Sequence, residues 1–389
     1  MDYSEVYEHQ LNSSSQLSTQ RGDFSLYSFL FIALILLLVT LGLITMYSAS
    51  YDEALRIGRS GSYFFTRQVV FALLGGLSFF IISHLSITFI KKLVTPLVII
   101  SVIFMLLTLF TPLGIEKAGA RRWLQLGPLP SFQPSELLKI AVILSISKML
   151  SSKASHKKSL IISILLIIGS FILIVAQKDY STALVFVSVS LLITIASGLS
   201  LLFFVLLALF FSIPATIFLL IEPYRIKRVV SFLFPSIDPS GMNYQVSKSL
   251  EAIKSGGLFG KGLGQGVYKL GIIPEVHSDF IFASYAEEMG IVGIILLFML
   301  FIAFTYIGIK IALNAKDNNA FMSLSCFGIT MMITTQALIN IMVVTSLLPP
   351  TGIPLPFFSQ GGTNLFVIIS ECAILYRCMK EERKEEKLW

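Results

Sequence analysis

The chain has 389 residues, of which 55% are hydrophobic and only 13% are charged, and its mean hydropathy is +0.83. A soluble domain carries about a quarter charged residues, so this composition excludes a soluble enzyme and predicts a polytopic membrane protein. The three cysteines show no pairing or metal-ligand spacing, which argues against a disulfide framework or a zinc site. The net charge of +7 suits contact with anionic lipid head groups.

Residues 1–25 are polar, rich in Ser and Gln, and lack the basic-then-apolar order of a cleaved signal peptide, so we expect a cytoplasmic N-terminal tail. Apolar runs of spanning length follow, and they predict an all-α integral membrane protein, a polytopic bundle of about ten transmembrane helices. These runs are 26–48, 64–84, 93–111, 135–150, 160–177, 180–197, 199–221, 279–311, 320–346 and 364–379.

The membrane domain is therefore expected to cover 26–379, followed by a cytoplasmic C-terminal tail at 380–389. A large extracytoplasmic loop, 222–278, would separate the seventh helix from the eighth. An even number of helices places both termini on one side. Basic residues number fourteen on each side, but fourteen against seven once the long loop is left out, which predicts cytoplasmic termini.

Basic residues on the outer face oppose this orientation and need another explanation. They are explained either by an anionic substrate, which we favour, or by contact with anionic lipid heads. In the loop before the fourth run, Arg121 and Arg122 offer forked donors that suit a pyrophosphate. Trp123 is either part of a site or an anchor at the membrane–water interface.

The fourth run begins with a helix start signal, a proline at the first helical position. Glu136 and Lys139 lie three residues apart there, on one helical face, and are expected to pair. A structural anchor and a catalytic role are both open for this pair. In the long loop, Gly256 to Gly264 lacks the pattern of a P-loop. We expect this backbone to bend tightly or to approach a ligand closely.

The stretch from Pro274 to Ala283 places His277 and Asp279 at the edge of an apolar run. An ionisable group at that depth is expensive and marks a functional site by default. Asp279 is therefore the candidate general base for a substrate with a polar head and a lipid tail. The last outer segment, 348–363, holds four prolines and is expected to be a re-entrant segment that lines the site, rather than a stiff connector.

Several segments, in order from residue 119 to residue 364, together resemble the SEDS family, which contains the FtsW and RodA proteins of bacterial division and elongation. The FtsW form is favoured. One departure puts a family role for Asp179 in doubt, because Lys178 and Ser181 stand where the family has Pro and Gly. The matching segments are GARRWL, FQPSELLK, YRIKR, DPSGMNYQ, SLEAIKSGGLFGKGLG, PEVHSDFIFA, AEEMG and TGIPLPFFSQGGTN.

The resemblance implies a peptidoglycan glycosyltransferase that polymerises lipid II at the outer face of the cytoplasmic membrane. It implies a class B penicillin-binding transpeptidase and other divisome membrane proteins as partners. The family's catalytic carboxylate falls on Asp279, its functional Trp on Trp123, and its helical Lys on Lys139.

We expect Asp279 to deprotonate the acceptor hydroxyl in a single, inverting displacement. Cationic side chains, alone or with Mg²⁺ or Mn²⁺, would stabilise the leaving pyrophosphate. No organic cofactor is expected. The candidate substrate-binding residues are Arg121, Arg122, Trp123, Gln133, Glu136, Lys139, Arg228, Gln245, Lys254, Pro274, Glu275, His277 and Ser359.

Three alternatives are open. The first is an elongation polymerase of the RodA type. The second is a lipid II flippase, since many helices and a broken outer segment also suit a transporter. The third is a non-catalytic division scaffold, whose role would survive the loss of the Asp279 carboxylate.

Overall fold

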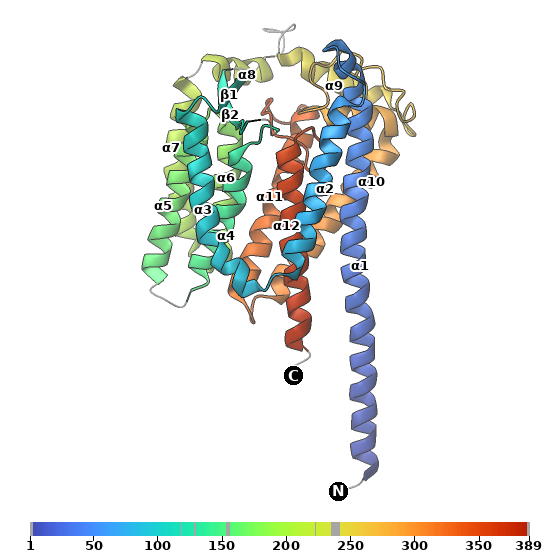
Figure 1. Cartoon of the computed structure of the whole chain (residues 1–389), viewed down its shortest axis with the longest axis vertical. Helices are drawn as coiled ribbons and strands as arrows, with labels where there is room; N and C mark the ends of the chain where they lie inside the picture. Colours follow the sequence, from blue (N-terminus) through green and yellow to red (C-terminus); the bar gives the residue numbers. More distant parts are fainter. Residues whose placement is uncertain are drawn as a thin grey trace.

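The computed structural model describes residues 3–117, 119–127, 130–152, 156–221, 223–234 and 242–386. Their regular secondary structure is helical apart from one β-hairpin (Figure 1). This confirms the predicted all-α membrane fold. The elements are α1 Tyr3–Arg56, α2 Tyr63–His84, α3 Ile87–Phe110, β1 Gly114–Lys117, β2 Ala120–Leu124, α4 Pro134–Leu150, α5 His156–Ala176, α6 Tyr180–Ala196, α7 Leu201–Ile221, α8 Pro223–Leu233, α9 Met242–Ser255, α10 Ile281–Asn314, α11 Ala320–Val344 and α12 Gly362–Glu386.

Each of the ten predicted spans lies in a helix of its own. Within the described residues, seven helices are long and apolar enough to cross a membrane: α1 from Tyr27, α2, α3, α5 from Lys157, α10, α11 and α12 to Glu381. Shorter apolar helices are α6 and, within α7, Phe204–Ile213, while α4 has 17 residues, so the count of ten stays a prediction. The predicted N-terminal tail is continuous with α1, and most of the C-terminal tail is continuous with α12.

The two chain ends lie at the same end of the bundle, and the β-hairpin, α8 and α9 lie at the opposite end (Figure 1). This is the arrangement that an even number of spans produces. The predicted loop 222–278 is partly helical, since it holds α8 and α9. Its Asp238–Gly241 part lies outside the described residues.

The helices α4 and α11 form the centre of the bundle. Nearly every side chain of α4 is buried, because α3, α5, α6, α11 and α12 all pack against it. The helix α2 packs mainly on α12, whereas α3 packs mainly on α4, so these consecutive helices diverge. Their divergence leaves room for a groove between them.

Candidate active site

Asp279 lies two residues before α10 begins. Ser278 Oγ donates to Asp279 Oδ1 at 2.9 Å. The side-chain amide of Asn340, on α11, donates at 2.8 Å both to the Asp279 carbonyl and to the Ile353 carbonyl. This one amide therefore joins the Asp279 segment, α11 and the non-helical segment that follows α11.

The environment of Asp279 favours its neutral form. Burial raises the pKa of this carboxyl, while the Ser278 hydroxyl and the positive charges of Arg228 and Arg122 oppose the rise, and the negative charge of Asp179 adds to it. Charged groups from α8, β2 and the α5–α6 turn thus act on one carboxylate. A carboxylate with a raised pKa is a stronger base, which is what proton abstraction near neutral pH needs.

Arg122 is held by the turn between α5 and α6. Its Nη2 donates to the Lys178 carbonyl at 2.6 Å, and its Nη1 lies 3.7 Å from Asp179 Oδ1. Gln133 Nε2 donates to the other carboxylate oxygen of Asp179 at 3.2 Å. Lys178 adopts a φ of 61°, a left-handed conformation that is uncommon for a residue with a side chain.

Asp179 is not among the sequence-based candidates, yet it contacts two of them. Its signal was present in the partial match to the family's Pro-Asp-x-Gly-Thr segment, but the departures at Lys178 and Ser181 weakened it. The structure brings Asp179 next to two candidates, Arg122 and Gln133, and buries it to 4% exposure. A group buried to that extent needs partners, and these two supply them.

The segment 345–361 is not helical, which covers most of the predicted segment 348–363, and its Gly352 lies at Asp279. Arg228 Nη1 donates to the Pro350 carbonyl at 3.1 Å. A side chain at Gly352 would begin 3.4 Å from Asp279 Oδ2, so this glycine lies directly at the carboxylate. Ser359 Oγ donates to the Ser278 carbonyl at 2.6 Å, which fixes the residue before Asp279.

His277 is buried and packs against α2, where its ring stacks on Phe64 with 5.1 Å between ring centres. Its backbone carbonyl accepts from the Gln360 amide at 2.9 Å. Burial lowers the pKa of His277, against the opposing effect of Glu275, Glu53 and the Gln360 side chain. A neutral imidazole packed in this way positions the segment that carries Asp279.

Glu136 and Lys139 pair at 2.8 Å, and both side chains are almost fully buried at the start of α4. Asn364 Nδ2, on α12, donates to the second oxygen of Glu136 at 2.8 Å. The predicted pairing is confirmed, and its geometry ties α4 to α12. Because the ammonium is already matched by a carboxylate, its positive charge is partly neutralised.

The remaining candidates lie in the β-hairpin, in the segment before α10 and on α9. Trp123 is in β2 of the hairpin, opposite Ile115. Arg121 points toward α3, since its Nη1 donates to the Leu109 carbonyl at 3.3 Å. Pro274 and Glu275 are exposed. Gln245 and Lys254 are on α9, and nothing in the described contacts joins them to Asp279, so their role stays a prediction.

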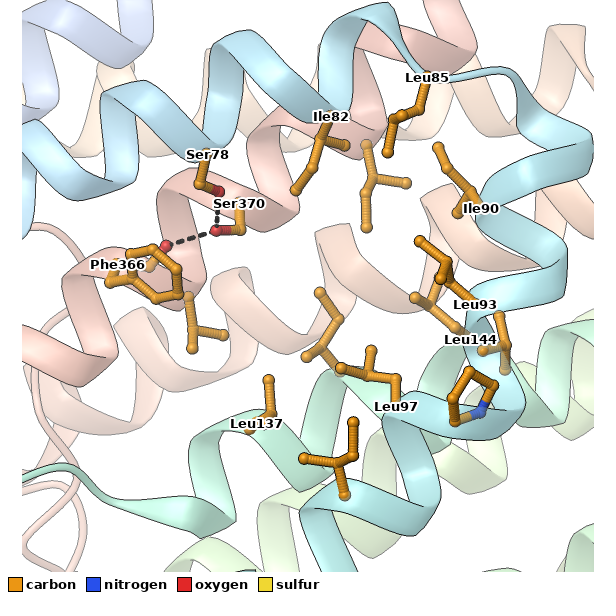
Figure 2. Close-up of a pocket in the computed structure, with 16 residues that line it drawn as sticks. Ser78, Ile82, Leu85, Ile90, Leu93, Leu97, Leu137, Leu144, Phe366 and Ser370 are labelled. Atoms are coloured by element: carbon orange, nitrogen blue, oxygen red, sulfur yellow. Dashed lines mark hydrogen bonds between the residues drawn. The ribbon is translucent and has the colours of Figure 1, made fainter. Parts of the chain in front are cut away.

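An apolar groove of about 310 Å³ lies between α2 and α3, with α4 and α12 behind it (Figure 2). Its one polar feature is a hydrogen bond between Ser78 and Ser370, whose hydroxyl oxygens are 2.5 Å apart. The Ser370 hydroxyl also donates to the Phe366 carbonyl. Leu137 and Ile140 of α4 line the groove, and each is next in sequence to a member of the Glu136–Lys139 pair.

Within the described residues, no group of three or more His, Cys, Asp and Glu side chains could hold a metal ion. Asp279 and Asp179 are a pair of carboxylates, and guanidinium groups lie near both. A divalent cation there would need further ligands from a substrate. The expectation of Mg²⁺ or Mn²⁺ stays untested.

Comparisons with known proteins place these features in a family. The family model described as "Cell cycle protein", for FtsW, RodA and SpoVE, matches residues 28–384. A probable peptidoglycan glycosyltransferase FtsW of Borreliella burgdorferi is 36% identical over 354 residues, which cover 90% of this chain and 96% of that protein. Stage V sporulation protein E of Bacillus subtilis is 36% identical over 358 residues, which cover 91% and 97% of the two chains.

Solved structures agree with this. A chain from a peptidoglycan synthase complex, described as coordinating polymerization and crosslinking, matches with a TM-score of 0.76 and 27% identity, covering 91% of this chain and 98% of that one. The rod shape determining protein RodA of Thermus thermophilus matches with a TM-score of 0.65 and 24% identity, covering 90% and 96%. The second match supports the fold alone.

Proposed function

The chain belongs to the FtsW/RodA/SpoVE family of cell cycle proteins, and from this premise we propose how its outer site polymerises lipid II. Its activity is that of a peptidoglycan glycosyltransferase, since relatives that it matches over nearly their whole length carry this name. Because those relatives are FtsW proteins, division is its role rather than elongation. The observation that carries the mechanism is that the charges of Arg228, Arg122 and Asp179, from three separate parts of the chain, all act on the buried carboxyl of Asp279.

Asp279 is the general base. It removes the proton from the acceptor hydroxyl as that oxygen attacks the anomeric carbon of the donor sugar. The bond between that carbon and the pyrophosphate oxygen breaks in the same displacement, so the configuration at the carbon inverts. Burial supports this role, because it raises the pKa of the carboxyl and so strengthens the base.

The leaving pyrophosphate collects negative charge as it departs. Arg122 and Arg228 are the cations near Asp279, and both guanidinium groups are already oriented by backbone carbonyls. Oriented donors stabilise developing charge without reorganising at the moment of reaction. Lys139 contributes mainly through its pairing with Glu136, which anchors α4 to α12. A divalent cation would supply further charge stabilisation when bound.

The polyprenyl tail of the substrate lies in the groove between α2 and α3. The groove is lined almost entirely by apolar side chains and is bounded by two diverging membrane helices, which supports entry from the bilayer (Figure 2). Apolar surface gains little by moving from lipid to protein, so this groove guides the tail more than it binds it. The polar head then meets Asp279 at the outer end.

The chain is a multi-pass membrane protein. We place it in the cytoplasmic membrane with both termini inside and Asp279 facing outward, as the distribution of basic residues favours. Its partner is a class B penicillin-binding transpeptidase, which the similarity to a chain of a peptidoglycan synthase complex supports.

The test is to purify the chain with this partner and to follow glycan length from labelled lipid II for wild type, Asp279→Asn and Asp317→Asn. Asp317 is an exposed carboxylate on the connection between α10 and α11 and serves as the control. We expect polymer from wild type and the control, and none from Asp279→Asn. Equal polymer from all three would remove Asp279 as the base, and transport of lipid II without polymer would favour a flippase.

A further inference from the structure

The eighth predicted span is not one continuous helix. At Gly290 the backbone of α10 leaves the helical region, with φ 64° and ψ −165°. The break separates a short outer half, 281–289, from a long inner half, 291–314. Asp279 lies just before the outer half, so the direction of that half sets where the catalytic carboxylate lies.

A break exposes backbone groups that a continuous helix would pair. On the outer side of this break, the carbonyls of Glu287 and Glu288 accept from the backbone amides of Lys261 and Gly262, at 3.0 Å and 3.1 Å. The outer half-helix therefore ends on a segment of the long loop. We name residues 256–270 the splint.

The splint also pairs the inner side of the break. The amides of Ile291 and Val292 donate to the carbonyls of Gly257 and Leu258, at 2.9 Å and 3.1 Å. One short segment thus bridges both half-helices. An unpaired backbone group in the membrane costs several kcal/mol, so these four bonds make the broken form of α10 stable.

Glycines make this close approach possible. A side chain at Gly290 would begin 2.3 Å from the Gly260 nitrogen, and one at Gly260 would begin 2.0 Å from the Glu288 carbonyl oxygen. Those distances are too short for any Cβ atom. From the sequence, we expected Gly256 to Gly264 to bend tightly or to approach a ligand closely. In the structure, this stretch approaches the backbone of α10.

Two buried carboxylates lock the splint in place. Glu287, fully buried, accepts from Lys261 Nζ at 2.6 Å and from the amides of Val267 and Tyr268 at 2.8 Å and 3.1 Å. Glu288 pairs with Lys269 at 2.5 Å.

Ser48 of α1 joins the second pair. Its hydroxyl donates to Glu288 Oε1 at 2.6 Å, and it accepts from Lys269 Nζ. These ion pairs and hydrogen bonds therefore fix the splint to the outer half of α10 and to α1. Each of the two buried carboxylates already has a lysine as its partner. Such ion pairs suit a fixed structure better than a binding site.

We propose that Glu287 and Glu288, with Lys261 and Lys269, are positioning residues that hold the outer half of α10 and thereby aim Asp279 at the acceptor hydroxyl. This rests on the proposed glycosyltransferase function. The four residues do not touch the substrate. They act through the direction of a half-helix, and a displacement of about 1 Å at a reacting group can cost about 100-fold in rate.

The test uses the full chain with its transpeptidase partner, labelled lipid II, and the variants Lys261→Gln, Lys269→Glu and Lys269→Glu/Glu288→Lys. We expect kcat to fall at least about tenfold in both single variants, with KM within about twofold of wild type. The double variant restores the opposite charges and should return kcat to within about threefold of wild type. Asp317→Asn is again the control, because Asp317 is exposed on the connection between α10 and α11.

Lys261 is partly exposed, so Lys261→Gln remains informative if the buried variants do not fold. Unchanged kcat in folded Lys261→Gln would overturn the proposal. So would a folded double variant that stays as slow as Lys269→Glu, or a loss of kcat that merely follows a loss of folded protein. Inactivity of wild type, or full activity of Asp279→Asn, would instead overturn the proposed function.

Discussion

The side-chain amide of Asn340 donates to the backbone carbonyl of Asp279 at 2.8 Å, and the same nitrogen donates to Ile353 at 2.8 Å. Asn340 is almost fully buried in α11, four residues before that helix ends at Val344. A single amide of the bundle core therefore fixes both walls of the site, the Asp279 segment and the non-helical segment after α11.

Replacing Asn340 by Ala should leave two buried carbonyls without their donor. We expect a loss of about 1–3 kcal/mol in stability and a fall of about 10- to 100-fold in kcat as Asp279 shifts. Thermal unfolding and single-turnover glycan synthesis would measure the two effects. Asn340→Asp should be worse, because a carboxylate would then face two carbonyl oxygens. Wild-type kcat in folded Asn340→Ala would show that the amide does not position Asp279.

The raised pKa of Asp279 has a consequence for stability. Because the folded-state pKa lies above the unfolded one, the folded state prefers the protonated form, and stability is lost as pH rises through the folded pKa. Asp279→Asn should therefore unfold at a higher temperature than wild type near pH 7, and the difference should shrink at low pH. Melting curves over a pH series would test this, and an Asn variant less stable at every pH would contradict it.

The negative charge of Asp179 contributes to the raised pKa of Asp279. Asp179→Asn should lower the pKa of Asp279, so the fall of kcat on acidification should begin at a lower pH than in wild type. The same change removes the partner of Arg122, so the rate at the optimum should also fall. A pH–rate profile separates the two effects. An acid limb that stays in place would show that the two carboxylates do not interact.

The Glu136–Lys139 pair can be tested as an anchor. Lys139→Met alone leaves a buried carboxylate without its cation and should cost about 3–5 kcal/mol. Glu136→Gln/Lys139→Met removes both charges and should recover most of that loss, as followed by thermal unfolding. If the recovered double variant also polymerises lipid II, the pair is structural. A stable but inactive double variant would assign Lys139 a direct part in catalysis.

Filling the groove should affect substrate entry and not chemistry. Leu97→Trp places a large ring among the side chains that line it, and we expect KM for lipid II to rise while kcat changes little. Ile103→Trp on the same helix is the control, because Ile103 points away from the protein. For a lipid II analogue with a short tail, KM should be the same in wild type and in both variants. An unchanged KM in Leu97→Trp would exclude the groove as the path of the tail.

Composition and hydropathy by themselves determined the fold class and the approximate ends of the helices, because a chain in a membrane must pair its backbone within helices. The same rule predicted a non-helical segment at 348–363, since prolines cannot supply those bonds, and the structure leaves 345–361 outside the helices. Asp279 was found for a related reason: a carboxylate at the start of an apolar run is costly, and the sequence shows it directly. The Glu136–Lys139 pair followed from helical spacing alone.

Only the tertiary structure decided which distant segments meet. Asp179, Arg228 and Asn340 come from three separate elements, and no local pattern states that they converge on Asp279. The break at Gly290 was equally hidden, because a single glycine in an apolar run is compatible with a continuous helix. What makes it a break is the splint, whose amides and carbonyls replace the missing helical bonds. Such pairing depends on contacts between parts of the chain that are distant in sequence, and periodicity carries no information about them.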